Sequence, residues 1–69
     1  MTIFLTPREM EIARLVGQGK ANKDIAAVLG LSPGTVKEYL NHVFKKLGIH
    51  RRIELAAWIL SQEHEAQQK

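Results

Sequence analysis

Three polar side chains in the middle of the chain are spaced so that they could contact nucleic acid together. Lys37, Asn41 and Lys45 are four residues apart and would form one stripe along a helix. Glu38 and His42 would form the adjacent stripe. An α-helix fits the major groove of B-DNA, where lysine binds guanine O6 and N7, and asparagine binds adenine N6 and N7. The pattern is compatible with base reading, but the solvated polar face of an ordinary surface helix looks the same.

The residues that precede this stripe suit a phosphate oxygen. Ser32, Gly34 and Thr35 stand where a helix should begin, so they offer hydroxyl groups and backbone N–H groups that the helix itself leaves free. One short segment thus carries side chains that can contact base edges and groups that can bind backbone phosphates.

Capping and periodicity predict the helices that position these groups. Pro7 and Pro33 each follow a hydroxyl residue, as at helix starts. Glu9 stands three residues after Thr6, the spacing of a capping box. The expected helices run from 7 to the glycines at 17 and 19, from about 22 to 29, from 33 to about 47, and from about 51 to 63. No segment alternates like a strand, so the predicted fold class is all-α, without a wing.

Apolar residues at helical spacing give each predicted helix a buried face. The second helix would bury Ile25, Ala26, Val28 and Leu29. The third would bury Val36, Leu40, Val43, Phe44 and Leu47. The fourth has the widest stripe: Ile53, Ala56, Ala57, Ile59 and Leu60, widened by Leu55 and Trp58.

A turn of about three residues containing Gly30 separates the second helix from the third, which is the signature of a helix-turn-helix. This motif places one helix against the other so that the second can enter the major groove. The motif favours DNA contact over a merely solvated face.

Composition narrows the alternatives. The 69 residues allow one small domain over 1–69, with a core of about 5–62 and a frayed tail at 63–69. The net charge of +3 and pI near 9.6 allow an anionic partner. The chain has no cysteine and no ligand-like histidine spacing, so we expect no metal and no cofactor. It has no apolar run of about 20 residues and no signal peptide, so we expect a cytoplasmic protein rather than a membrane protein. No nucleophile–base set can be assembled, and we do not expect an enzyme.

Almost the whole chain, about residues 5–60, resembles the output domain of the LuxR/FixJ/NarL (GerE-type) family of bacterial transcription regulators. The matching stretches are Leu5-Thr6-Pro7-Arg8-Glu9, Gly19, Asn22-Lys23-Asp24-Ile25-Ala26, Leu29, Ser32, Thr35-Val36-Lys37, Lys46-Leu47, Ile49 and Arg52. The resemblance implies a four-helix helix-turn-helix domain whose third helix enters the major groove and whose fourth can pair two protomers. It implies double-stranded DNA as the partner, a homodimer that need form only on DNA, and a contact with RNA polymerase.

The resemblance also implies roles for individual residues. Base contacts would fall to Lys37, Glu38 and Asn41. Phosphate contacts would fall to Asn22, Lys23, Ser32, Thr35, Lys45, Lys46 and Arg52. The dimer interface would fall to Leu55, Trp58 and Ile59.

Three residues depart from the family pattern. Ala21 stands where a Ser or Thr usually caps the second helix, Tyr39 where a His is usual, and Leu55 where a small Ala is usual. The apolar width of Leu55, Trp58 and Ile59 on the fourth helix, together with the unusual Tyr39 and Glu38, leaves a second hypothesis open. It is an interaction protein that pairs with a full-length regulator and inhibits it without binding DNA. RNA binding is a third, weaker option, because the chain lacks an aromatic platform for single strands. The length fits either an excised C-terminal domain or a stand-alone regulator of the GerE type.

Overall fold

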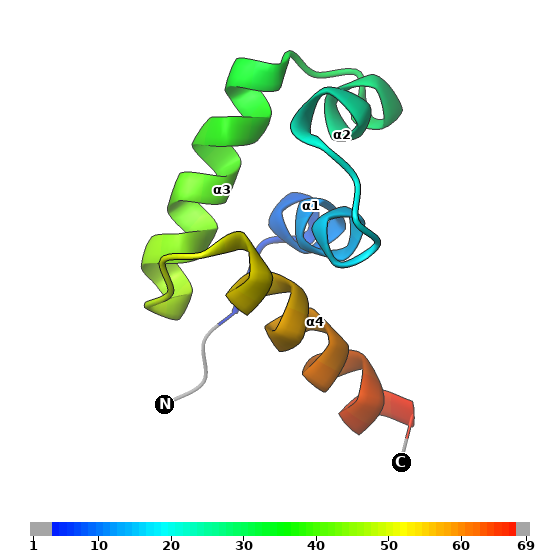
Figure 1. The fold of residues 1–69 in the computed structure, drawn as a ribbon, viewed down its shortest axis with the longest axis vertical. Coiled ribbons are helices and arrows are strands. Elements are labelled where there is room, and N and C mark those ends of the chain that lie inside the picture. The colour runs from blue at the N-terminus through cyan, green and yellow to red at the C-terminus, as the bar shows by residue number, and fades with distance from the viewer. Residues whose placement is uncertain (1–3, 68–69) are drawn as a thin grey trace.

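The computed structural model describes the backbone of residues 4–67 and the side chains of residues 4–63. It contains α1 (Pro7–Gly17), α2 (Asn22–Leu29), α3 (Pro33–Leu47) and α4 (Arg52–Gln67), as Figure 1 shows. No strand occurs between residues 4 and 67, so the prediction of an all-α four-helix fold is confirmed. The fourth helix continues to Gln67, beyond the predicted end at residue 63, and the last two residues of the predicted frayed tail lie outside the described part.

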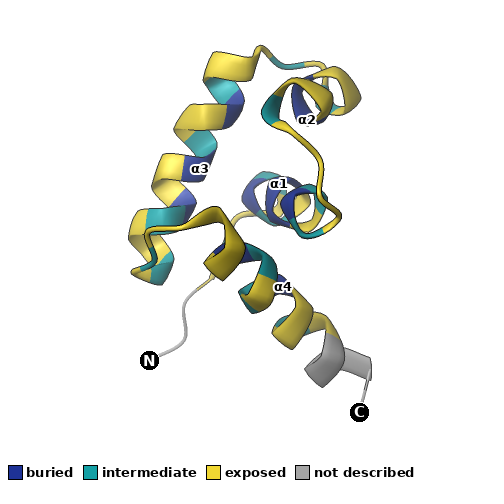
Figure 2. Ribbon diagram, in the orientation of Figure 1, coloured by how far each residue is buried: buried dark blue, intermediate teal, exposed yellow. Residues whose placement is uncertain are grey.

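The first helix is the element on which the others pack. It contacts α2, α3 and α4, and α2 also packs against α3. Figure 2 shows that the buried sides of α1, α2 and α3 face one another, while the outer side of α3 is exposed. The core consists of Ile12, Ala13, Val16, Ile25, Ala26, Val36, Leu40, Val43, Leu55 and Ile59.

Helix starts are fixed by the caps that the sequence predicts. The Thr6 side chain accepts a hydrogen bond from the Glu9 backbone N–H at 3.2 Å, and the Glu9 carboxylate accepts one from the Thr6 backbone N–H at 2.8 Å. The predicted capping box is therefore present. At the start of α3, the Ser32 hydroxyl accepts from the Thr35 backbone N–H at 3.1 Å. Both caps satisfy backbone donors that would otherwise lack a partner in the first turn.

The predicted buried faces of α2 and α4 need correction. Val28 is 64% exposed, and so is not part of the core. On α4, Ile53 and Leu60 are 71% and 58% exposed, whereas Leu55 and Ile59 are buried. Apolar residues occupy most of the circumference of α4 between positions 53 and 60, so periodicity alone does not select a face. Packing against α1 selects it, and the side bearing Leu55 and Ile59 is the one that turns inward.

Gly17 lets α1 and α4 approach closely. A Cβ atom at Gly17 would lie 2.6 Å from the Cγ2 atom of Ile59, closer than Cβ atoms approach other atoms in real proteins. The glycine at the end of α1 therefore has a packing role in addition to ending the helix. A larger residue there would force Ile59 to shift.

Candidate nucleic-acid interface

The turn between α2 and α3 fixes the angle between these two helices. Gly30 ends α2 in the left-handed conformation, with φ 69° and ψ 34°, which favours glycine because it has no Cβ atom. The Leu31 backbone N–H then bonds back to the Ala26 carbonyl oxygen at 2.9 Å. Ser32 follows as the N-cap of α3. The predicted helix-turn-helix is present at the predicted residues.

The outer face of α3 carries the side chains predicted to contact bases. Lys37, Glu38 and Asn41 are all exposed, as are His42 and Lys45 further along the helix. The opposite face of α3 is buried: Val36, Leu40 and Val43. The structure therefore brings the predicted base-reading residues together on one solvent-facing surface.

Ser32 and Thr35 form a hydroxyl pair at the start of this face. Their side-chain oxygens lie 2.9 Å apart, and the Ser32 oxygen also accepts the Thr35 backbone N–H. One hydroxyl proton of the pair lies between the two oxygens, which leaves the other available to an external acceptor. The predicted phosphate-binding hydroxyls are thus placed by their role in capping α3.

Lys46 differs from the other predicted phosphate-binding lysines. Its Nζ atom lies 2.7 Å from Oε1 of Glu9, whose side chain is 5% exposed. Burial raises the pKa of the Glu9 carboxyl, but hydrogen bonds from Lys46 and Thr6 and the Lys46 charge outweigh it, so the net pKa is lowered. Lys46 therefore binds a buried carboxylate in this structure, and its predicted contact with phosphate stays a prediction. The sequence-based reasoning missed this pair because its members are far apart in the chain.

Arg52 and Asn22, also predicted to bind phosphate, bind each other. The Arg52 guanidinium donates from Nη1 to Oδ1 of Asn22 at 2.8 Å and from Nη2 to the Lys20 carbonyl oxygen at 2.6 Å. The start of α4 is thereby tied to the start of α2. Arg52 acts as a positioning residue, whereas the Asn22 amide still carries N–H groups to donate. Lys23, the next residue, is exposed, and its predicted contact with phosphate stays a prediction.

Residues 4–59 match the family described as "Bacterial regulatory proteins, luxR family". The chain belongs to this family. It is 44% identical over 55 residues to the nitrate/nitrite response regulator protein NarL of Escherichia coli, an alignment covering 80% of this chain and 26% of NarL. It is 48% identical over 52 residues to the transcriptional regulatory protein UhpA of Escherichia coli, covering 75% of this chain and 26% of UhpA.

A Mycobacterium bovis protein named as an HTH-type transcriptional regulator is 51% identical over 51 residues, covering 74% of this chain and 6% of that protein. The chain thus spans about a quarter or less of the length of these relatives. The luxR family is one of DNA-binding regulatory domains rather than of enzymes, and the resemblance noted from the motifs is confirmed.

Two of the three residues predicted for the dimer interface of this luxR-family domain are buried in the structure. Leu55 is 0% and Ile59 2% exposed, so both side chains belong to the core of their own protomer. Trp58 is half-buried against the same core. Among the described side chains of α4, the large apolar ones that are exposed are Ile53 and Leu60, seven positions apart and therefore on one side of the helix.

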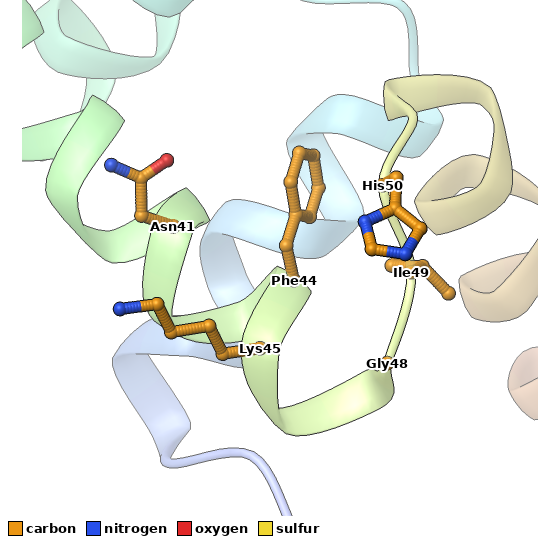
Figure 3. A pocket seen from close by; sticks show the side chains of 6 residues that line it. All are labelled: Asn41, Phe44, Lys45, Gly48, Ile49 and His50. Carbon is orange, nitrogen blue, oxygen red and sulfur yellow. The ribbon is translucent and has the colours of Figure 1, made fainter.

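Two hollows border the exposed face of α3. One is lined by Thr35, Glu38, Tyr39 and His42. The other lies at the end of α3 and is lined by Asn41, Phe44, Lys45, Gly48, Ile49 and His50 (Figure 3). Motif reasoning missed the second hollow because it is formed by the α3–α4 loop.

Two classes of site are lacking in the described part of the chain. No three His, Cys, Asp or Glu residues are grouped there so as to hold a metal ion. In the same part, no helix is long and apolar enough to cross a lipid bilayer.

Proposed function

We propose that this luxR-family domain binds double-stranded DNA sequence-specifically to regulate transcription, with α3 in the major groove. The observation that carries the proposal is the exposed stripe Lys37, Asn41 and Lys45 on a helix that α2 and the α2–α3 turn hold in place. Within the described side chains, none of these three takes part in a hydrogen bond or ion pair. Their polar groups are therefore available to a partner that lies along α3.

The proposed DNA-binding surface divides into residues that read bases and residues that bind phosphates. Lys37 suits guanine, Asn41 suits adenine, and the Glu38 carboxylate suits the N4 amino group of cytosine. Lys23 and Lys45 lie near the two ends of the helix-turn-helix and the Ser32–Thr35 hydroxyl pair at its turn, where they suit backbone phosphates. A carboxylate on this face also disfavours binding through phosphates alone, which supports selective rather than general DNA binding.

Pairing of two protomers would fit this function through α4. The exposed residues Ile53 and Leu60 take the place of the buried Leu55 and Ile59 in this proposal. An interface built on one face of α4 would bury less area than a stable dimer needs. The dimer is therefore expected to form on DNA rather than in free solution. The competing hypothesis of an inhibitor that does not bind DNA loses its main support, since two of the residues that motivated it are core residues.

A selection from a random duplex library with the purified chain at moderate salt tests the proposal. Enrichment of a repeat with one fixed half-site spacing is the expected result, because two α3 helices enter successive major grooves. Failure to enrich any sequence, with the protein shown by circular dichroism to be folded, would overturn it.

The Lys37→Ala variant separates base reading from sequence-independent electrostatic attraction to DNA. We expect it to lose about tenfold or more on the selected site, with little loss on random duplex, because base contacts carry sequence discrimination. The Ser61→Ala variant, which removes an exposed hydroxyl on α4, is the matched control. An equal loss for Lys37→Ala on both duplexes would show that Lys37 does not read a base.

A further inference from the structure

The hollow at the end of α3 combines polar groups on its rim with an apolar wall. It has a volume of about 430 Å³ and opens to solvent. Figure 3 shows Asn41 and Lys45 projecting from one side of α3, and His50 standing across the hollow on the loop that leads to α4. Half-buried Phe44 lies between them, and half-buried Ile49 lies next to His50 on the loop; both line the hollow. Asn41 and Lys45 belong to the proposed DNA-binding face, so the hollow is continuous with it.

The loop that carries His50 is held in one conformation. Gly48 ends α3 with φ 66° and ψ 33°, and the Ile49 backbone N–H bonds back to the Phe44 carbonyl oxygen at 3.0 Å. The Glu54 carboxylate accepts the backbone N–H groups of His50 and Arg51 at 3.1 and 2.9 Å. These bonds use the backbone of His50 and leave its imidazole exposed. The side chain is therefore displayed at a fixed place beside α3.

The chemistry of the hollow matches one unit of a nucleic-acid backbone. An apolar wall suits the face of a deoxyribose, whereas an imidazole N–H and an ammonium group suit phosphate oxygens. The Glu54 carboxylate lies against the loop, where its Oε1 atom is already bound to two backbone N–H groups. Figure 3 shows the Lys45 ammonium directed away from His50, so the lysine side chain would have to turn toward the hollow to bind the same phosphate.

We propose that this hollow seats the sugar–phosphate backbone of one DNA strand, with deoxyribose against Phe44 and Ile49, and that His50 is a phosphate-binding residue. The proposal rests on the proposed DNA binding and extends the interface from α3 onto the α3–α4 loop. His50 was not among the residues that motif reasoning assigned to DNA. The occupant is a backbone phosphodiester, so the contact is independent of base sequence.

A methylphosphonate scan tests this assignment. In the selected duplex, each phosphate in turn is replaced by a neutral methylphosphonate, and binding is measured by fluorescence anisotropy for the full chain and for the His50→Ala variant. We expect His50→Ala to bind about three- to tenfold more weakly on selected and random duplex alike, as for loss of one hydrogen bond to a phosphate. At one phosphate, the methylphosphonate should weaken the unaltered protein but not the variant.

The outcomes are distinguishable. If the unaltered chain binds no duplex, both the proposed function and the assignment of the hollow to a DNA strand are overturned. If it binds and shows the same methylphosphonate profile as His50→Ala, the assignment of His50 is overturned although DNA binding stands. The His50→Gln variant, which keeps a neutral N–H donor, should retain more affinity than His50→Ala. Ser61→Ala is again the control, and thermal unfolding checks that each variant is folded.

Discussion

The Nζ atom of Lys46, at the end of α3, lies 2.7 Å from a carboxylate oxygen of Glu9, in the first turn of α1. Glu9 is the only charged residue among the buried ones in the described part of the chain. Its Oε1 also accepts the Thr6 backbone N–H, so one oxygen serves both the cap of α1 and the contact with α3. The orientation of the proposed DNA-binding helix is thus coupled to the start of the first helix.

Acid should weaken the fold partly through Glu9. Its pKa is lowered in the folded state, so its contribution to stability is complete above the ordinary glutamate pKa of about 4.3 and is lost as pH falls through the lower, folded-state value. Urea unfolding from neutral pH into the acid range should show a smaller loss of stability for Glu9→Gln than for the unaltered chain. Parallel pH profiles for the two proteins would contradict this role.

Neighbouring lysines should respond differently to salt. Lys45 is exposed and proposed to contact phosphate, whereas Lys46 is engaged by Glu9. Lys45→Gln should lower the slope of log affinity against log salt by about one unit per protomer, because one fewer phosphate is neutralised. Lys46→Gln should leave that slope nearly unchanged while lowering stability. Equal reductions in slope for both variants would mean that Lys46 leaves Glu9 when DNA binds.

Gly17 and Gly34 should differ in their tolerance of alanine. A Cβ at Gly17 meets Ile59 at 2.6 Å, so Gly17→Ala should destabilise the domain by about 1–3 kcal/mol through overpacking. At Gly34 the nearest atom is 3.9 Å away and φ is not positive, so Gly34→Ala should be neutral or stabilising by about 0.4–1 kcal/mol. Chemical denaturation measures both. Stabilisation of the domain by Gly17→Ala would refute the close approach of α1 and α4.

A cap can be added to α2. Ala21 occupies the N-cap position with extended backbone angles and makes no side-chain hydrogen bond, while Asp24 accepts the Ala21 backbone N–H at 3.3 Å. A serine hydroxyl at this position would satisfy a free donor of the first turn, so Ala21→Ser should stabilise the domain by about 1 kcal/mol. Thermal unfolding of Ala21→Ser beside Ala27→Ser, an exposed mid-helix control in α2, would check this. An equal effect in both variants would exclude capping as the cause.

The sequence was sufficient for the features that depend on near neighbours. The caps at Thr6 and Ser32, the turn at Gly30 and the limits of α2 and α3 each follow from residues within a few positions of one another. The exposed face of α3 also follows, because its buried face is a single clean stripe. These are the features that place Lys37 and Asn41.

The sequence was insufficient for features that depend on distant packing. The inward face of α4 could not be chosen, because apolar residues surround that helix and only contact with α1 decides between Leu55 and Ile53. The roles of Lys46 and Arg52 could not be foreseen either, since their partners lie 37 and 30 positions away. Motif matching assigned Lys46 and Arg52 to phosphate because they are basic, whereas in the structure each side chain connects two helices.

The anchoring of α3 has a consequence for the thermodynamics of binding. The helix is buried along its inner face, capped at Ser32 and Gly48, and tied at its far end through Lys46. Its conformational entropy is therefore lost when the chain folds, and little remains to be lost when a ligand arrives. A preorganised helix of this kind should associate with a preformed duplex as a nearly rigid body, without a coupled folding step and its signature in the heat capacity.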